Sequence, residues 1–218
     1  MDVMEAMRIR QTIRKYKSTP LPKSVIKEVI TSAIRAPSAM NIQPWEFVIL
    51  AGDVLDDIRK ANVEKYSSDH LELKAPVLHG VYRARQVQIA AKLFNAMGIA
   101  RGDQEKRAWW TLRGYRYFDA PAVIIVCMDK SLDNKMVFDL GLVTQSICLA
   151  ALNLGLGTAI MDQGIVFPDI IRKFTHIPES TDFITSIAIG YPEPDFPANK
   201  VISDRENVEN ITTWFGFE

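Results

Sequence analysis

The feature of the sequence that most restricts its fold is an uninterrupted apolar run, AVIIVCM, at residues 122–128. Pro121 precedes the run and Asp129 follows it, so its length suits one strand. A strand that is apolar on both faces must be covered on both faces. We therefore expect a sheet with this strand at its centre and helices packed on either side.

Other patterns predict the elements around this strand. Residues 136–154 are apolar almost all round and stop at Gly155, which predicts a core helix with a glycine cap. Asp2 and Glu5 resemble a capping box, and Pro37 ends a periodic run. Helical periodicity is expected at 3–7, 24–34, 55–61, 87–97 and near 168–174, and strands at 45–50, 158–161 and 183–189. The pattern favours one α+β domain over residues 1–218.

Composition and charge limit the partners and the compartment. Lys plus Arg and Asp plus Glu both number 26, so no overall field draws the protein to nucleic acid or an anionic membrane. The longest apolar stretches, such as residues 121–128, are too short to cross a bilayer, and the N-terminus lacks the pattern of a signal peptide. Cys127 and Cys148 are interpreted as small core residues in a reducing compartment. A soluble, cytoplasmic protein is expected.

A basic cluster near the N-terminus is the first candidate site. It consists of Arg8, Arg10, Gln11, Thr12, Arg14 and Lys15, and Lys200 and Arg205 form a second basic group near the other end. Arginine forks and a threonine hydroxyl suit a phosphate monoester, which accepts several charge-assisted hydrogen bonds. A solvated helix end is the more frequent explanation for such a cluster taken alone.

The segment PSAMNIQPW at residues 37–45 is the second candidate site. Two prolines bracket small and amide-bearing residues, which predicts a stiff loop able to hydrogen-bond a flat polar ligand. An ordinary helix-to-strand connection explains the segment equally well.

Several other kinds of site are disfavoured. The glycines of LGLGT at residues 154–158 follow a helix instead of opening one, which argues against a Rossmann nucleotide site. His70, His79 and His176 show neither metal-ligand spacing nor an evident triad partner. An organic cofactor is therefore the expected carrier of any chemistry, with no metal. Trp109, Trp110, Tyr115, Tyr117 and Phe118 are interpreted as core or interface packing, with an aromatic lid over a planar substrate as the alternative.

Four segments, taken in order, resemble the nitroreductase family of flavoproteins. They are RQTIRKY at residues 10–16, APSAMNIQPWEFV at 36–48, DLGLVTQSICLAALNLGLGT at 139–158 and IAIGYPEPD at 187–195. The ending, NKVISDRENVENITTWFGFE, is most similar to the branch that includes nitrobenzoate-reductase-like enzymes. The resemblance implies a small, mainly antiparallel sheet covered by helices, and a homodimer with FMN at its interface and C-terminal tails exchanged between subunits.

The resemblance also implies which residues hold the flavin. Arg10, Gln11, Thr12 and Arg14 would hold the phosphate, the ribityl chain and the pyrimidine edge, and Arg205 would complete the phosphate site. Pro37, Ser38, Met40 and Asn41 of the other subunit would line the ring, and Met161, Asp162 and Gln163 would place backbone amides near N5 and O4. The chain departs from the usual family pattern at Gln11, Thr12 and Ala39-Met40.

The activity implied is reduction of nitroaromatics, quinones or similar electron-poor compounds, in which NADPH or NADH gives a hydride to FMN N5 and a small-molecule oxidant follows at the same face. No catalytic side chain is implied beyond the flavin. Three alternatives stay open. The same site serves dehalogenation, enoate reduction or breakdown of the flavin itself; the protein binds flavin without turnover; or it is an interaction domain without cofactor.

Overall fold

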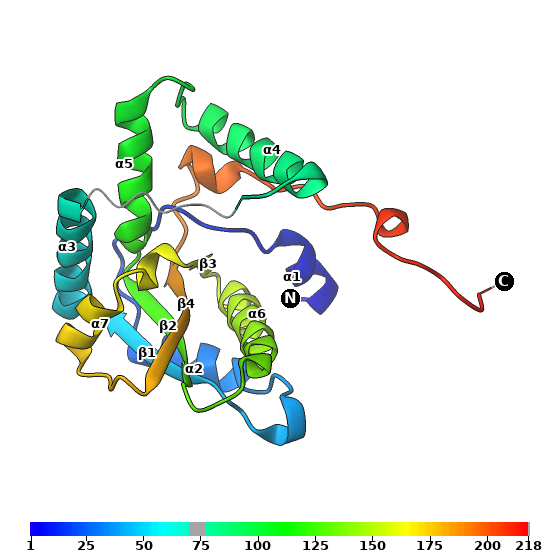
Figure 1. The fold of residues 1–218 in the computed structure, drawn as a ribbon, viewed down its shortest axis with the longest axis horizontal. Coiled ribbons are helices and arrows are strands. Elements are labelled where there is room, and N and C mark those ends of the chain that lie inside the picture. Colours follow the sequence, from blue (N-terminus) through cyan, green and yellow to red (C-terminus); the bar gives the residue numbers. More distant parts are fainter. Residues whose placement is uncertain (70–76, 218) are drawn as a thin grey trace.

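The computed structural model describes residues 1–69 and 77–217 and has a four-stranded antiparallel sheet at its centre (Figure 1). The strands are β1 (Glu46–Ala51), β2 (Ala122–Asp129), β3 (Gly157–Met161) and β4 (Thr181–Gly190), in the order β1-β2-β4-β3. The predicted α+β fold with a small antiparallel sheet is confirmed. His70 lies outside the described residues.

Strand β2 is the centre of the core, as its sequence predicts. All of its residues from Ala122 to Met128 are buried, and only Asp129 is exposed. Strand β1 differs from the prediction of a buried strand at 45–50, because it pairs with β2 alone and lies at an edge of the sheet. Ile49 in β1 is 44% exposed, whereas Trp45, just before the strand, is buried.

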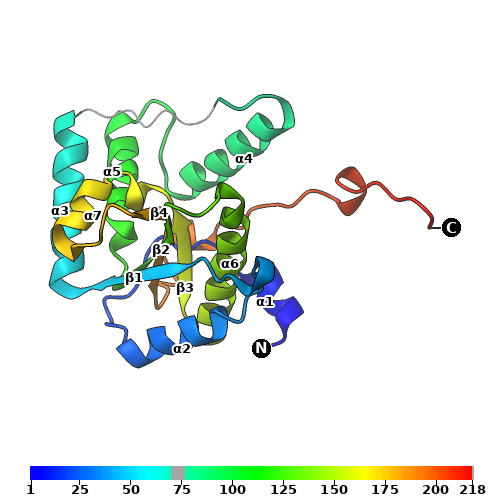
Figure 2. The ribbon, with the colours of Figure 1, turned by 60° about the horizontal axis from the view of Figure 1, so that its bottom comes forward.

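Helices cover both faces of the sheet (Figures 1 and 2). Val123 and Ile125 of β2 belong to a core cluster with residues of α3 (Gly52–Asp69), α5 (Gln104–Tyr115) and α7 (Pro168–Thr175). Ile124 and Val126 point the other way, into a cluster with residues of α2 (Lys23–Ala33) and α6 (Val137–Asn153). Because side chains alternate along a strand, one apolar run supplies both cores.

Helix α6 is the predicted core helix and ends before Gly155, whose φ of +74° suits a glycine cap. Residues 134–153, which include α6, are long and apolar enough to span a membrane by length and composition alone. The expectation that every apolar stretch is too short is therefore wrong. In the structure α6 packs against α2, and Leu140, Val143 and Ile147 are buried in the core, so it serves as a core helix.

Three segments lie outside this layered core. Asp2 is the N-cap of helix α1 (Val3–Ile9), as predicted, and its carboxylate accepts from the Met4 N–H and not from Glu5, the expected capping-box partner. Val3 and Met7 of this helix are more than half exposed. Helix α4 (Gly80–Ala96) has no buried residue. The C-terminal tail runs away from the body of the chain (Figures 1 and 2). The short 3-10 turns are η1 (Ala39–Asn41), η2 (Tyr117–Asp119), η3 (Asn134–Met136), η4 (Gln163–Ile165), η5 (Pro197–Lys200) and η6 (Val208–Asn210).

Candidate functional site

The segment after α1 is fixed to the edge of the sheet. Thr12 forms a parallel bridge with Thr158 of β3, and the Ile13 N–H donates to the Thr158 carbonyl at 2.9 Å. Gly157 allows this close approach, since a Cβ there would lie 2.5 Å from the Ile13 side chain. The basic cluster is therefore held against the core and is not a freely solvated helix end.

Tyr16 anchors the other end of the same segment. Its hydroxyl donates to the carbonyls of Ile13 at 2.8 Å and Ala188 at 3.1 Å. Complete burial raises the pKa of Tyr16 well above its usual value, so the hydroxyl stays protonated and keeps donating. The two anchors restrict the path of the chain between Gln11 and Lys15.

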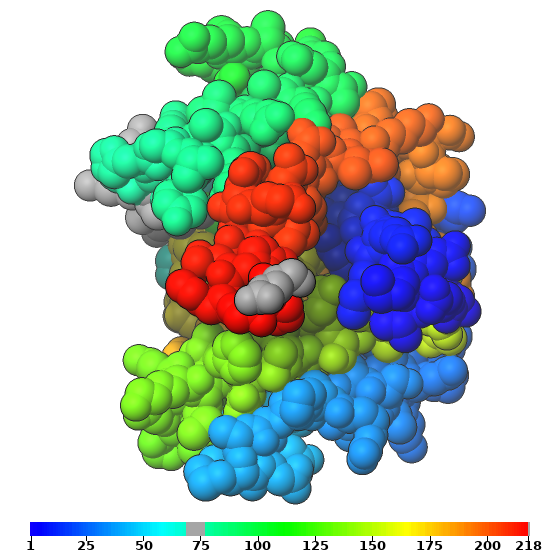
Figure 3. All heavy atoms as spheres, turned by 90° about the vertical axis from the view of Figure 1, so that its right-hand side faces the viewer, coloured from blue at the N-terminus to red at the C-terminus, as the bar shows by residue number. Residues whose placement is uncertain are grey.

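A cavity of about 600 Å³ opens beside this segment, between α1 and the residues that follow η5. Figure 3 shows α1 in dark blue and the C-terminal residues in red on the same face of the molecule. The lining residues come from α1, the segment after it, α4 and residues 201–205: Met4, Met7, Arg8, Arg10, Gln11, Thr12, Arg14, Ile89, Val201, Ile202, Ser203 and Arg205. The five predicted residues Arg10, Gln11, Thr12, Arg14 and Arg205 thus line one cavity.

The polar groups of this cavity fit an anionic ligand with several hydrogen-bond acceptors. Its described lining includes four arginines and no carboxylate, and none of the four has an ion-pair partner within residues 1–69 and 77–217. The Gln11 Oε1 atom is buried without a hydrogen-bond partner. Burial lowers the pKa of Arg14, which nevertheless stays charged at neutral pH. An FMN phosphate, ribityl chain and pyrimidine edge would satisfy these groups.

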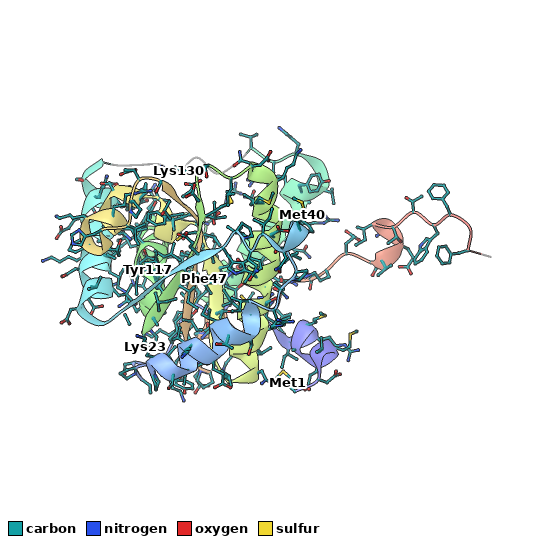
Figure 4. The ribbon with its side chains drawn as sticks, turned by 90° about the horizontal axis from the view of Figure 1, so that it is seen from below. Met1, Lys23, Met40, Phe47, Tyr117 and Lys130 are labelled. Atoms are coloured by element: carbon teal, nitrogen blue, oxygen red, sulfur yellow. The ribbon has the colours of Figure 1, made fainter. Side chains whose placement is uncertain are left out.

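The predicted loop at residues 37–43 is strained and exposed. Met40, Asn41 and Gln43 all have positive φ values, of 50°, 58° and 51°. Ser38 Oγ accepts from the Gln43 N–H at 3.0 Å, which ties the two ends of the turn together. Met40 is 86% exposed (labelled in Figure 4), so its side chain has almost no contact within its own chain. Strained residues of this kind cluster at ligand sites and switch regions.

The loop and the arginine-lined cavity lie at different ends of α6. The Ala39 N–H donates to Asp139, near the first turn of α6, whereas Leu152, near its last turn, lines a neighbouring hollow with Arg10. Thirteen residues of helix separate these points by roughly 20 Å. Pro37, Ser38, Met40 and Asn41 do not line the described part of the cavity in their own chain.

The third predicted group also lies apart from the cavity. Met161 ends β3, and its carbonyl accepts from the Ser186 hydroxyl. Asp162 is exposed and accepts from Thr185 Oγ1 at 3.2 Å. The Gln163 side chain donates to the Thr111 carbonyl at 3.4 Å and packs beside α5. These residues do not line the arginine-lined cavity as the structure describes it.

The residues singled out for other roles have ordinary environments. Tyr115, Tyr117 and Phe118 are buried in the core beneath α3 and α7, which agrees with packing, while Trp109 is 45% exposed. His79 and His176 are exposed. Within the described residues no group of three His, Cys, Asp or Glu side chains could hold a metal. Cys127 and Cys148 are free and buried, as predicted.

Three buried polar residues that the sequence patterns do not predict support the candidate site residues. Asp139 holds the strained loop through Ala39, and Arg113 and Asn199 bind the backbone of Arg14. Asp139 stands within a segment that carries the family resemblance, which could have drawn attention to it. No sequence pattern marks Arg113 or Asn199, because each contacts Arg14 only through the folded chain.

Known proteins resemble this chain over almost its whole length. The nitroreductase family model matches residues 7–191. Chloronitrobenzene nitroreductase of Comamonas testosteroni is 27% identical over 216 residues, covering 96% of this chain and 95% of that protein. 4-Nitrobenzoate reductase of Pseudomonas putida is 27% identical over 212 residues, covering 96% and 93%. The structure of an FMN-dependent nitroreductase from Mycobacterium smegmatis in complex with NADPH superposes with a TM-score of 0.89 at 22% identity, covering 98% and 100%.

The antiparallel sheet with its covering helices is thus the nitroreductase fold. Because the family model covers most of its length, this chain belongs to the nitroreductase family.

Proposed function

We propose that this chain is an FMN-dependent NAD(P)H oxidoreductase that reduces nitroaromatics, quinones and similar electron-poor compounds. The observation that carries the proposal is the cavity lined by Arg10, Arg14 and Arg205, whose polar groups suit a flavin phosphate and pyrimidine edge. Membership of the nitroreductase family and relatives named as nitroreductases support the same activity. When bound, FMN supplies a ring that accepts a hydride from NADPH or NADH and returns electrons to an oxidant.

The polar residues Arg10, Gln11, Thr12, Arg14 and Arg205 of the cavity have distinct roles in this proposal. Arg10 and Arg205 bind the phosphate, for which the guanidinium fork is well shaped. Gln11 and Thr12 bind the ribityl chain and the pyrimidine edge. Arg14 would lie by N1 and C2=O, where its positive charge would stabilise negative charge on the ring and so favour reduction. Residues 161–163 do not line this cavity, and in the proposal their backbone amides would meet the part of the ring that extends beyond it, at N5 and O4.

The working unit in this proposal is a homodimer. Pro37, Ser38, Met40 and Asn41 do not line the cavity of their own chain, which supports a ring lined by the same loop of a second copy. Large apolar side chains are exposed on α1, α6, the segment after η5 and the tail: Val3, Met4, Met7, Phe138, Ile202, Ile211, Trp214, Phe215 and Phe217. Figure 3 shows α1, α6 and the tail gathered on one face, and such a surface is typical of an interface.

The exposed tail fits the same assembly. Trp214 and Phe217 contact each other edge to face at 5.2 Å, yet both rings are more than half exposed. Burying such rings against a partner contributes strongly to association. We therefore assign the tail to the surface of the second subunit.

A subunit-complementation experiment tests the shared site. Arg14→Met breaks the cavity, and Met40→Trp places a large ring where the partner's flavin would lie, on a side chain that has room in its own chain. Each homodimer should oxidise NADPH slowly with 4-nitrobenzoate as acceptor. A purified heterodimer of the two variants contains one intact site and should recover about half of the wild-type rate.

The control is the double variant Arg14→Met/Met40→Trp mixed with wild-type subunits, which leaves each site with one defect. That heterodimer should stay slow. An inactive single-variant heterodimer, or equal activity of both mixtures, would contradict a site built from two subunits. Wild-type protein that binds no FMN would contradict the whole proposal.

We also propose that the enzyme works in the cytoplasm. Cys127 and Cys148 are both free and buried, which suits a reducing compartment. Cell fractionation with a cytosolic marker tests this location, and recovery with an envelope fraction would contradict it.

A further inference from the structure

We propose that Arg113 and Asn199 are positioning residues that fix Arg14 against the flavin and thereby set the reduction potential. The inference rests on the proposed function, because it gives Arg14 its place beside the flavin ring. Arg113 and Asn199 themselves do not line the arginine-lined cavity.

Both backbone groups of Arg14 are bound by buried side chains. The Arg14 N–H donates to Asn199 Oδ1 at 2.6 Å, and the Arg14 carbonyl accepts from Arg113 Nη2 at 2.7 Å. Arg113 lies on α5, 99 residues along the chain, and Asn199 lies on η5, 185 residues along. Two distant elements thus converge on one residue of the candidate site.

The surroundings of Arg113 hold its guanidinium in one orientation. Arg113 is 7% exposed, and its guanidinium lies over the Trp109 ring at 5.3 Å and the Phe196 ring at 5.0 Å. Its Nη1 atom lies 3.6 Å from Asp119 Oδ2, while its Nε is buried without a hydrogen-bond partner. Burial lowers the pKa of Arg113, since desolvation disfavours its charge.

Burying the charged Arg113 side chain costs free energy that simple packing would not require. An apolar side chain of similar volume would avoid the desolvation of a charge and the unpaired Nε, and replacements of that kind are often neutral or stabilising. What an apolar side chain cannot supply is the directed N–H that binds the Arg14 carbonyl. We therefore assign to Arg113 the role of holding the Arg14 backbone in place.

Asn199 completes the arrangement from the other side. Asn199 is 4% exposed, and its Nδ2 donates to the carbonyls of Lys15 at 2.8 Å and Glu193 at 2.9 Å. Its Oδ1 accepts from the Arg14 N–H. The Asn199 amide group therefore links the segment after α1 to the chain after β4. Fully satisfied polar networks of this kind hold one geometry.

Arg14 itself combines a fixed backbone with a free side chain. Within residues 1–69 and 77–217 its guanidinium forms neither a hydrogen bond nor an ion pair, although the residue is half-buried. A cation held in place before its ligand arrives needs no reorganisation when charge develops on that ligand. Loosening the backbone of Arg14 would weaken this electrostatic effect without removing the charge.

The test is a double-mutant cycle on the FMN-loaded protein, with the two-electron potential measured by spectroelectrochemical titration at saturating FMN. Arg113→Met should shift the potential in the same negative direction as Arg14→Met, and FMN should bind roughly tenfold more weakly. If Arg113 acts through Arg14, adding Arg113→Met to Arg14→Met should cause no further shift in potential. Asn199→Ala should behave like Arg113→Met, and Arg113→Lys should restore part of the effect.

Arg172→Met is the matched control. Arg172 Nη2 also donates to a backbone carbonyl, that of Thr181 at 2.6 Å, and its guanidinium lies over the Phe183 ring at 4.6 Å. Arg172 is on α7 and does not line the cavity. This variant should lower the unfolding midpoint while leaving the potential unchanged, which separates positioning from general loss of stability.

The outcomes distinguish this inference from the proposed function. If Arg14→Met shifts the potential but Arg113→Met and Asn199→Ala do not, the positioning role is wrong and the flavin site stands. An equal shift by Arg113→Met in the Arg14→Met background would also overturn it. If Arg14→Met changes neither FMN binding nor potential, the assignment of Arg14 fails first. Should Arg113→Met not fold, Asn199→Ala and Arg113→Lys carry the same cycle.

Discussion

The carboxylate of Asp139 accepts a hydrogen bond from the backbone N–H of Ala39, with 3.1 Å between the two atoms. Asp139 is 5% exposed, and Ala39 begins the turn in which Met40 and Asn41 have positive φ values. Such backbone conformations cost about 1–3 kcal/mol each and persist only where the surroundings enforce them. The bond from α6 therefore helps to hold the loop that we assign to the partner's flavin.

A substitution at Asp139 should disturb this loop more when it removes the hydrogen-bond acceptor than when it keeps one. Asp139→Leu leaves the Ala39 N–H without its partner and should lower the free energy of unfolding by about 1–3 kcal/mol. It should also weaken FMN binding by the dimer, whereas Asp139→Asn keeps an oxygen acceptor and should lose less. Urea unfolding and flavin fluorescence titration measure the two effects.

The control for Asp139 is Asp129→Asn, because Asp129 also accepts from a backbone N–H, that of Ser131 at 2.7 Å, in an exposed turn. This change should leave FMN affinity as it is. An unchanged FMN affinity in Asp139→Leu would show that the loop does not line the flavin.

Arg14→Met should make the flavin harder to reduce. The substitution removes the positive charge nearest the predicted position of N1 and C2=O, so the negative charge of the reduced ring loses stabilisation. The two-electron potential should fall and the rate of reduction by NADPH should decrease. Spectroelectrochemical titration measures the potential, with Lys23→Met at the exposed start of α2 as control. A potential equal to that of the wild type would rule out the placement of Arg14 beside the ring.

The fold could be predicted from the sequence where one segment carries its own pattern. The central strand and helix α6 follow from apolar runs, and the cations of the cofactor cavity follow from the cluster at residues 8–15. Helix α5 was missed because its sequence, QEKRAWWTLRGY, mixes charges and aromatics without a clean apolar stripe. The contacts of Arg113 and Asn199 with Arg14 could not be predicted, since they join residues 99 and 185 positions apart.

Alkaline pH should destabilise the protein through its buried thiols. Burial, followed by the charge of Glu46, raises the pKa of Cys127 from 9.0 to about 12. Because the folded pKa lies above the unfolded one, this stability is fully present below pH 9.0 and is lost as the pH rises toward 12. Each such thiol adds a slope of up to about 1.4 kcal/mol per pH unit.

The measurement is urea unfolding of the wild type and Cys127→Ala between pH 7 and pH 10, in which the buried tyrosines contribute equally to both proteins. Cys127→Ala should give a shallower decline above pH 9.0 than the wild type. Identical slopes for the two proteins would mean that Cys127 titrates normally in the folded state.

Removing the tail should weaken the dimer and leave the subunit folded. Residues 211–217 are exposed, so ending the chain at residue 210 removes few contacts among the described residues. Sedimentation equilibrium should show a larger dimer dissociation constant for the shortened protein, with an unfolding transition like that of the full chain at high dilution. Alanine at Trp214, Phe215 and Phe217 should reproduce most of the effect, and a dimer of unchanged affinity would contradict the role given to the tail.

The proposed oxidoreductase activity can be observed in the visible spectrum of the FMN-loaded protein, recorded in an anaerobic stopped-flow instrument. NADPH or NADH is mixed with the protein first, and a nitroaromatic compound is added second. Flavin absorbance should bleach with the nicotinamide and return with the oxidant. Bound flavin that neither nicotinamide reduces would contradict the oxidoreductase and indicate a flavin-binding protein.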